Sequence, residues 1–94
     1  MTQAELRALL ADALAVWGLA GDVAPEGADG VAVRTEGGRC VVRPAGEGMR
    51  PVWWFVSTPA REAAGRGARA AASIVGVLAM VRGEVALEAG TGSW

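Results

Sequence analysis

The sequence predicts an α+β fold in which an antiparallel sheet of three or four strands packs one face against two helices. Three observations support it: a capped amphipathic segment near the amino terminus, β-rich runs around a glycine pair followed by an aromatic run, and an apolar segment at 68–81. The predicted order is αβββα, with a last β-strand as an option at 84–88. We expect residues 1–89 to form one domain and residues 90–94 to form a loose tail.

The first predicted helix covers about residues 3–17. Thr2 and Glu5 have the spacing of a capping box, in which each side chain accepts a hydrogen bond from the backbone N–H of the other residue. Gly18 suits the left-handed position that ends such a helix. Apolar residues recur at helical spacing and form one stripe, made of Leu6, Leu9, Leu10, Ala13, Leu14 and Trp17.

A polar, turn-rich stretch at 21–30 predicts a loop, and the two runs that follow predict a hairpin with Gly37-Gly38 as its turn. That turn places Glu36 opposite Arg39 and Thr35 opposite Cys40. One face of the hairpin is then a core face: Val31, Val33, Thr35, Cys40 and Val42. The other face carries Ala32, Arg34, Glu36, Arg39, Val41 and Arg43.

A third strand is predicted at about 51–57, where adjacent Trp53 and Trp54 must point to opposite faces of the sheet. We prefer the register that turns Val52, Trp54 and Val56 inward, because Ser57 then lies outside. Which of the two tryptophans faces outward stays open, because the geometry of the loop before this strand is unknown.

The second predicted helix begins at Pro59, after the N-cap Thr58, and runs to Arg82. Gly65 and Gly67 each cost a helix interior roughly 1 kcal/mol relative to alanine, so a start near residue 68 is the alternative. Residues 84–88 alternate well enough for a fourth strand, and a frayed helical end is the other interpretation.

The composition fits a globular domain and leaves few chemical groups for catalysis. Hydrophobic residues make up 52% of the 94 residues and charged residues 20%, unlike a disordered chain. Lys, His, Tyr and Asn are absent and the nine basic residues are all Arg, a bias typical of a GC-rich bacterial or phage genome. Without His there is no His-based triad, and one cysteine supplies neither an intramolecular disulfide nor a Cys/His zinc site. We expect no enzyme, no metal and no cofactor.

The charge and hydropathy pattern predicts a soluble, cytoplasmic protein. A net charge of −1 gives no long-range attraction to nucleic acid or to an anionic membrane. The amino terminus lacks a basic region, and Asp12 interrupts its apolar stretch, so we expect no signal peptide. The apolar run at 70–81 would span about 18 Å as a helix, against a hydrocarbon core of about 30 Å.

The second face of the sheet is the candidate contact surface. Two helices cover one face of such a sheet, which leaves the other to water or to a partner. Its predicted contact residues are Trp53, Phe55, Arg34, Arg43 and Val41, a mixture of aromatic and Arg side chains typical of interaction hot spots. The alternative is that the second helix or the tail covers this face. Homodimerisation is the commonest way in which such a face is occupied.

Two further features receive competing interpretations. Arg66 and Arg69, at the start of the second helix, could bind an anion, although solvated Arg side chains are the simpler interpretation. The G-x-G-x-x-A pattern at 65–70 does not follow a strand directly, so it does not predict a dinucleotide site. Cys40, in a core-facing strand, is interpreted as an inert buried thiol.

Two families show a similar succession of elements. The order αβββα and the Gly/Arg-rich stretch at 65–70 resemble double-stranded RNA-binding domains, which implies RNA binding through Arg66 and Arg69 in place of the family's lysines. The leucine-rich helix, β-meander and second helix over residues 4–88 resemble the front half of the small acidic chaperones of type III secretion. That second resemblance implies a dimer that holds extended segments of client proteins.

The sequence therefore predicts a small non-enzymatic protein-interaction module: an adaptor, chaperone or inhibitor, with a phage or a mobile element as one candidate source. One alternative is a nucleic-acid- or anion-binding domain that uses Arg34, Arg43, Arg66 and Arg69. A second alternative is a small structural protein that homodimerises.

Overall fold

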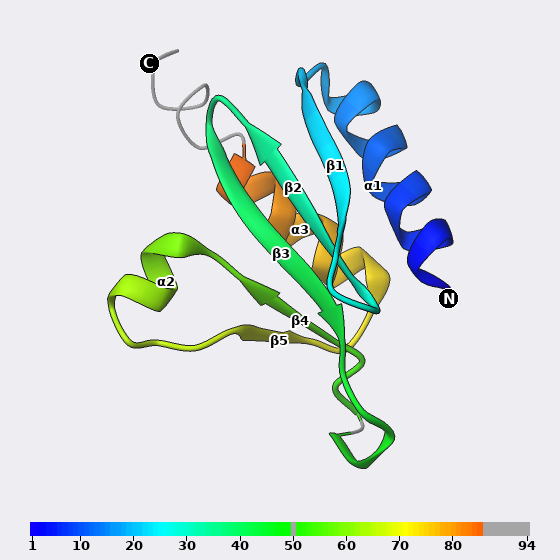
Figure 1. Ribbon diagram of the computed structural model, residues 1–94, viewed down its shortest axis with the longest axis vertical. Helices are drawn as coiled ribbons and strands as arrows, with labels where there is room; N and C mark the ends of the chain where they lie inside the picture. The colour runs from blue at the N-terminus through cyan, green and yellow to red at the C-terminus, as the bar shows by residue number, and fades with distance from the viewer. Residues whose placement is uncertain (50, 86–94) are drawn as a thin grey trace.

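The computed structural model describes residues 1–49 and 51–85, which form one five-stranded antiparallel sheet and three α-helices (Figure 1). The strand order is β1-β2-β3-β4-β5, so the sheet follows the chain. The elements are α1 (Gln3–Trp17), β1 (Gly21–Glu26), β2 (Gly30–Thr35), β3 (Gly38–Pro44), the 3-10 turn η1 (Glu47–Met49), β4 (Trp54–Ser57), α2 (Pro59–Ala63), β5 (Arg69–Ala71) and α3 (Ile74–Val85). The predicted α+β class is confirmed, with five strands instead of three or four.

Helix α1 begins and ends where its capping residues predict. Thr2 Oγ1 accepts a hydrogen bond from Glu5 N at 3.1 Å, and Glu5 Oε1 accepts one from Thr2 N at 3.0 Å. The bond from the Thr2 backbone is the largest cause that lowers the pKa of the Glu5 carboxyl. Gly18 takes the left-handed conformation, with φ 72°. The Gln3 side-chain amide donates to the carbonyl oxygens of Gly27 and Gly30 at 3.1 and 2.8 Å, which ties α1 to the β1–β2 hairpin.

Strand β1 corrects the prediction of a loop at 21–30. Gly21–Glu26 pairs along its whole length with β2, and only residues 27–29 form the connection. Pro25 concealed this strand, but proline is tolerated in an edge strand because its missing N–H need not join a ladder. At the other end, a Cβ on Gly21 would collide with the carbonyl oxygen of Arg34, so the close approach of β1 to β2 requires glycine there.

The β2–β3 hairpin has the predicted faces in a different register. Thr35 pairs with Gly38 and Val33 with Cys40, so the turn is Glu36-Gly37 and the predicted Gly37-Gly38 turn is wrong. The observed pairing differs from the predicted one by two residues, an even number, so every side chain stays on the face predicted for it. Thr35 fixes the turn, because its hydroxyl accepts from Gly37 N at 3.1 Å and donates to the carbonyl of Val85 at 2.7 Å.

The predicted second helix is wrong as a single element. Thr58 does cap a helix, accepting from Arg61 N at 3.1 Å, but α2 ends at Ala63. Residues 69–71 then form β5 against β4, and α3 begins at Ile74, where Ser73 Oγ accepts from Gly76 N at 3.1 Å. Because α3 continues to Val85, residues 84 and 85 are helical and not a strand. The rest of that predicted strand and the predicted 90–94 tail lie outside the described residues.

The observed order is αββββαβα, which differs from the αβββα order on which both family resemblances rest. The predicted strand 51–57 begins later, at Trp54, and its inward set is only partly confirmed. Val56 is buried and Trp54 is half-buried against the core, as the preferred register requires. Val52 lies before the strand and is half-buried.

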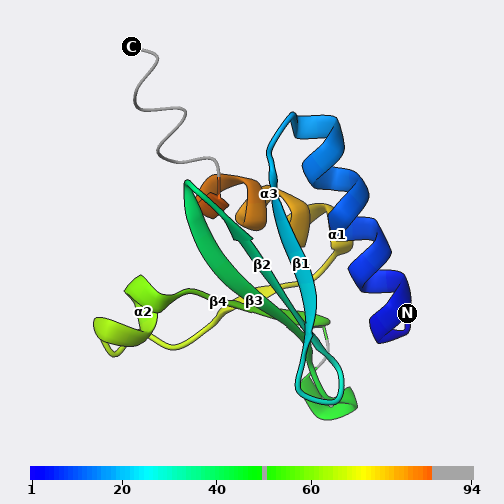
Figure 2. The same cartoon turned by 45° about the horizontal axis from the view of Figure 1, so that its top comes forward.

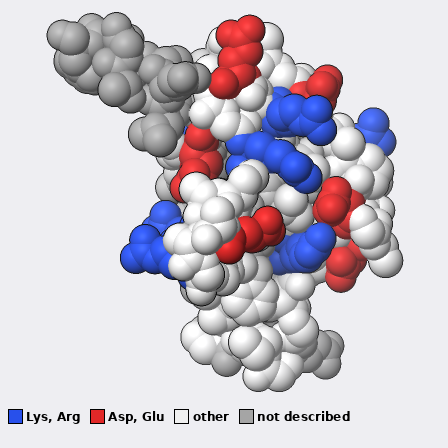
Figure 3. Space-filling view, turned by 60° about the vertical axis from the view of Figure 1, so that its left-hand side comes forward, with Lys and Arg blue, Asp and Glu red and all other residues white. Residues whose placement is uncertain are grey.

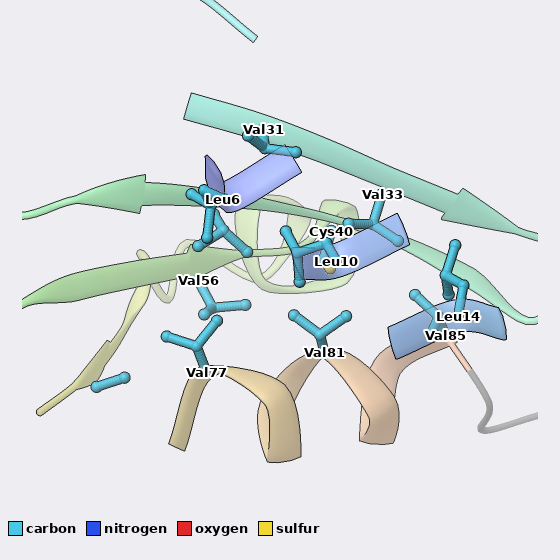
Figure 4. Packing of buried hydrophobic residues seen from close by; sticks show 12 residues of the cluster. Leu6, Leu10, Leu14, Val31, Val33, Cys40, Val56, Val77, Val81 and Val85 are labelled. Atoms are coloured by element: carbon cyan, nitrogen blue, oxygen red, sulfur yellow. The ribbon is translucent and has the colours of Figure 1, made fainter. Parts of the chain in front are cut away.

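The core lies between the sheet and two helices, α1 and α3, which both pack on the same face (Figures 2 and 4). Helix α1 contacts β1 and β2, whereas α3 contacts β2, β3, β4 and β5. The buried residues are Leu6, Leu10, Leu14, Val31, Val33, Cys40, Val42, Val56, Ala71, Val77, Val81 and Val85. Helix α2 buries none of its residues, so it adds nothing to this core.

Candidate functional site

The face of the sheet opposite α1 and α3, here the outer face, is the surface that the core leaves open. Side chains alternate across a strand, so the neighbours of buried Val33, Cys40, Val42 and Val56 point away from the helices. The outer face comprises Asp22, Ala24 and Glu26 of β1, Ala32 and Arg34 of β2, Arg39, Val41 and Arg43 of β3, Phe55 and Ser57 of β4, and Ala70 of β5. Figure 3 shows positive and negative side chains interspersed with uncharged surface on this side of the molecule.

One row of the outer face carries excess positive charge. Arg34 has Asp22 as its Cα partner on one side and Arg39 on the other. Like charges directly opposite one another in a sheet are destabilising. Within the described residues, neither Arg34 nor Arg39 has a carboxylate oxygen within 4.0 Å of its guanidinium. Arg34 and Arg39 therefore leave this row with a net positive charge, since neither forms an ion pair within the described residues.

The other two rows combine apolar and charged groups. Val41 lies between Ala32 and Ser57, and Phe55 lies between Arg43 and Ala70. Val41 and Phe55 are half-buried. Arg43 Nη2 lies 3.8 Å from Glu26 Oε1, with 51% and 39% of the two side chains exposed, so this ion pair contributes little to stability.

The structure brings together four of the five predicted contact residues: Arg34, Val41, Arg43 and Phe55 share the outer face. Arg39 joins them as a further candidate. The predicted register had paired Arg39 with Glu36, whereas the observed register places it opposite Arg34. Had the turn been placed at Glu36-Gly37, the pair of opposed arginines would have been evident from the sequence.

Trp53 lies on a different part of the surface. It is 43% exposed and precedes β4, and its ring centroid lies 6.4 Å from that of Trp54 at an interplanar angle of 39°. The two rings line a shallow apolar depression together with Met1, Ala72, Ser73 and Ile74. The Trp53 backbone continues the sheet, because its N–H donates to the Ala71 carbonyl at 3.0 Å and its carbonyl accepts from Ala45 N at 2.7 Å, so Trp53 lies at the edge of the outer face, beside this depression.

Neither Arg66 nor Arg69 lies at a helix start, so the helix N-terminus on which the alternative of an anion site rested is not there. Arg66 follows α2, and Arg69 belongs to β5 as the Cα partner of Val56. Since Val56 points to the core side, Arg69 points to that side as well, away from Arg43. Arg69 therefore does not share the outer face with Arg34 and Arg43, as the nucleic-acid alternative requires.

Cys40 is buried in the core, as predicted. Desolvation, with a smaller contribution from the nearby Glu84 carboxylate, raises the pKa of its thiol from 9.0 to about 12. Both effects disfavour the thiolate, which is the nucleophilic form of cysteine. At neutral pH this side chain acts as a small apolar group that fills space between β3 and α3.

We expect the stability of the folded protein to fall as the pH rises from about 9 towards about 12. Over that interval the unfolded thiol loses its proton while the folded thiol retains it, so the free energy of unfolding decreases with pH. The chain has no lysine or tyrosine, the other side chains that ordinarily titrate there. Urea unfolding at pH 7, 9 and 10.5 measures the effect, and the slope should vanish in Cys40→Ala. An equal slope in both proteins would contradict the assignment.

Among residues 1–49 and 51–85, no cluster of three His, Cys, Asp or Glu side chains is placed to hold a metal ion. In the same part of the chain, no helix has the length and apolar character needed to cross a membrane. The outer face is thus the feature with the clearest chemical character. No protein family model, curated protein or solved structure shows significant similarity to this chain.

Proposed function

We propose that this chain is a small non-enzymatic protein-interaction module that acts as an adaptor, chaperone or inhibitor and binds a protein through the outer face. The observation that carries the proposal is the position of Phe55 and Val41 among three arginines on the face that neither α1 nor α3 covers. Aromatic and Arg side chains are enriched in the residues that dominate binding energy at interfaces. The proposal includes the cytoplasmic location and the bacterial or phage origin expected from the composition.

The charge pattern also favours a protein partner over nucleic acid. Asp22 and Glu26 lie on the same face as Arg34 and Arg43, and their carboxylates would repel a phosphate backbone that crossed the sheet. A protein partner can place acidic groups opposite the arginines and basic groups opposite Asp22 and Glu26. The mixture on this face therefore suits a partner that carries acidic, basic and apolar groups itself.

Replacing Phe55 by alanine is expected to abolish partner capture while lowering the free energy of unfolding by about 1 kcal/mol. The small loss in stability follows because the ring is only half-buried. The measurement is affinity capture from lysate of the source organism with quantitative mass spectrometry, alongside urea unfolding. Val75→Ala is the matched control, because Val75 is 72% exposed on α3.

Two outcomes would contradict the proposal. Capture of the same proteins in the same amounts by Phe55→Ala, wild type and Val75→Ala would mean that the outer face makes no contact. A loss of several kcal/mol in Phe55→Ala would indicate a ring that is fully buried in the core, and the face would not be available for binding.

A further inference from the structure

The outer face carries two strips of opposite charge with matching spacing. On β1, Asp22, Ala24 and Glu26 point outward in the order acidic, small apolar, acidic. On β3, Arg39, Val41 and Arg43 point outward in the order basic, apolar, basic. Alternate residues of a strand lie about 6.8 Å apart, so both strips have the same repeat.

The register aligns these strips row by row. Asp22 and Arg39 are both Cα partners of Arg34, and Ala24 and Val41 are both partners of Ala32. Glu26 is the partner of Gly30, and a Cβ on Gly30 would come within 3.0 Å of Arg43 Cγ. Each acidic residue of β1 thus shares a row with a basic residue of β3, and the apolar residues share the row between them.

We propose that the occupant of the outer face is a second copy of this chain, related by a two-fold axis that runs along β2. This inference rests on the proposed function and names the partner. A rotation about β2 keeps each row in place and exchanges β1 with β3, because the two strands flank β2. Asp22 then meets the partner copy's Arg39, Glu26 meets its Arg43, and Ala24 meets its Val41.

The residues on the axis suit this arrangement with one exception. Ala32 of β2 meets its own copy, and its small size permits close approach of the two sheets there, whereas Gly30 is buried beneath the Arg43 side chain, which must turn from Glu26 of its own copy to that of the partner. Arg34, in contrast, meets the partner copy's Arg34, and the two positive charges oppose association. Removing this charge should therefore strengthen the dimer, whereas it would weaken binding of an acidic partner.

The dimer is expected to be weak. Three strands of about 20 Å, spaced 4.8 Å apart, offer a projected area on the order of 300 Å² per copy, with Phe55 of β4 at its border. Stable interfaces bury about 800 Å² per partner, so this contact belongs with small, transient interfaces. We expect a dissociation constant between about 10 µM and 1 mM and a rise in that constant with salt, because the contact depends on exposed charge pairs.

Charge exchange tests the inference with the full chain. One variant combines Arg39→Asp with Arg43→Glu, and the other combines Asp22→Arg with Glu26→Arg. Sedimentation equilibrium from about 10 µM to 1 mM should show wild type associating, each variant alone remaining monomeric, and the equimolar mixture of the two associating again. Arg34→Ala should lower the dissociation constant at least about threefold. Arg7→Asp and Asp12→Arg, on the exposed side of α1, make matched charge changes and should behave as wild type.

Each outcome bears on the inference. Monomeric wild type at 1 mM, or a dimer that persists in both variants, would overturn it. A mixture that fails to associate although both variants are folded by circular dichroism would also overturn it, as would weaker association of Arg34→Ala. A monomeric wild type whose partner capture still depends on Phe55 would leave the proposed function standing, with another protein as the occupant.

Discussion

Leu10→Ala is expected to lower the free energy of unfolding by about 3 kcal/mol, the largest effect of any single truncation in α1. Leu10 is 1% exposed, at the centre of the buried stripe formed with Leu6 and Leu14 (Figure 4). Removing its isobutyl group loses the transfer free energy of the buried atoms and leaves a cavity beneath β2. Because a domain of this size has a total stability of about 10 kcal/mol, the variant should unfold at clearly lower urea concentration.

Val16→Ala is the control for this truncation. Val16 lies on the same helix and is 84% exposed, so the change removes little contact and replaces a β-branched residue by the best helix former. Its free energy of unfolding should lie within about 0.5 kcal/mol of wild type. Equal losses in Leu10→Ala and Val16→Ala would mean that α1 does not pack on the sheet through its leucine stripe.

Gly38→Ala is expected to destabilise the protein by about 2–3 kcal/mol, although alanine is compatible with a strand. A Cβ at this position would collide with the carbonyl oxygen of Glu84 in the last turn of α3. The helix end would have to move, and the hydrogen bond from the Thr35 hydroxyl to the Val85 carbonyl, 2.7 Å long, would be lost with it. Urea unfolding followed by tryptophan fluorescence measures the loss.

Gly83→Ala supplies a control of opposite sign one residue before Glu84. Nothing lies within 4 Å of a Cβ built on Gly83, and the residue belongs to α3. The substitution should raise stability by about 0.5–1 kcal/mol, because alanine restricts the unfolded chain and favours the helix. If Gly38→Ala were as stable as wild type or more stable, as Gly83→Ala is expected to be, the close contact between β3 and α3 would be disproved.

The elements with local signals were predictable from the sequence. The ends of α1 follow from Thr2, Glu5 and Gly18, whose chemistry acts within one turn of helix. The faces of the β2–β3 hairpin were also predictable, because an error of two residues in register preserves them. Alternation therefore placed Arg34, Val41 and Arg43 correctly on the open face although their predicted partners were wrong.

The missed elements depend on pairing that no local signal reveals. Residues 69–71 are helix-forming in composition, yet they form β5 because β4 offers an edge with unpaired N–H and C=O groups. Ser73 was the available signal for a new helix, since its hydroxyl caps α3. In β1, Pro25 and the surrounding glycines indicated a loop, and only the docking of α1 over the β1–β2 hairpin makes a strand there favourable.

The meander has a consequence for the rate of folding. Every strand after the first pairs with the strand before it, so the sheet forms through connections between consecutive strands, which are closed faster than long-range ones. Much longer closures are needed when α3 returns to the sheet, where Thr35 bonds Val85, 50 residues away, and when Arg82 of α3 reaches the Trp17 ring at the end of α1. Loop-closure entropy grows with the length of the loop, so docking of α3 is the most costly step for the chain to complete. The β-hairpins can form before α3 is in place, whereas the core closes only when α3, which follows all five strands in the chain, docks on the sheet.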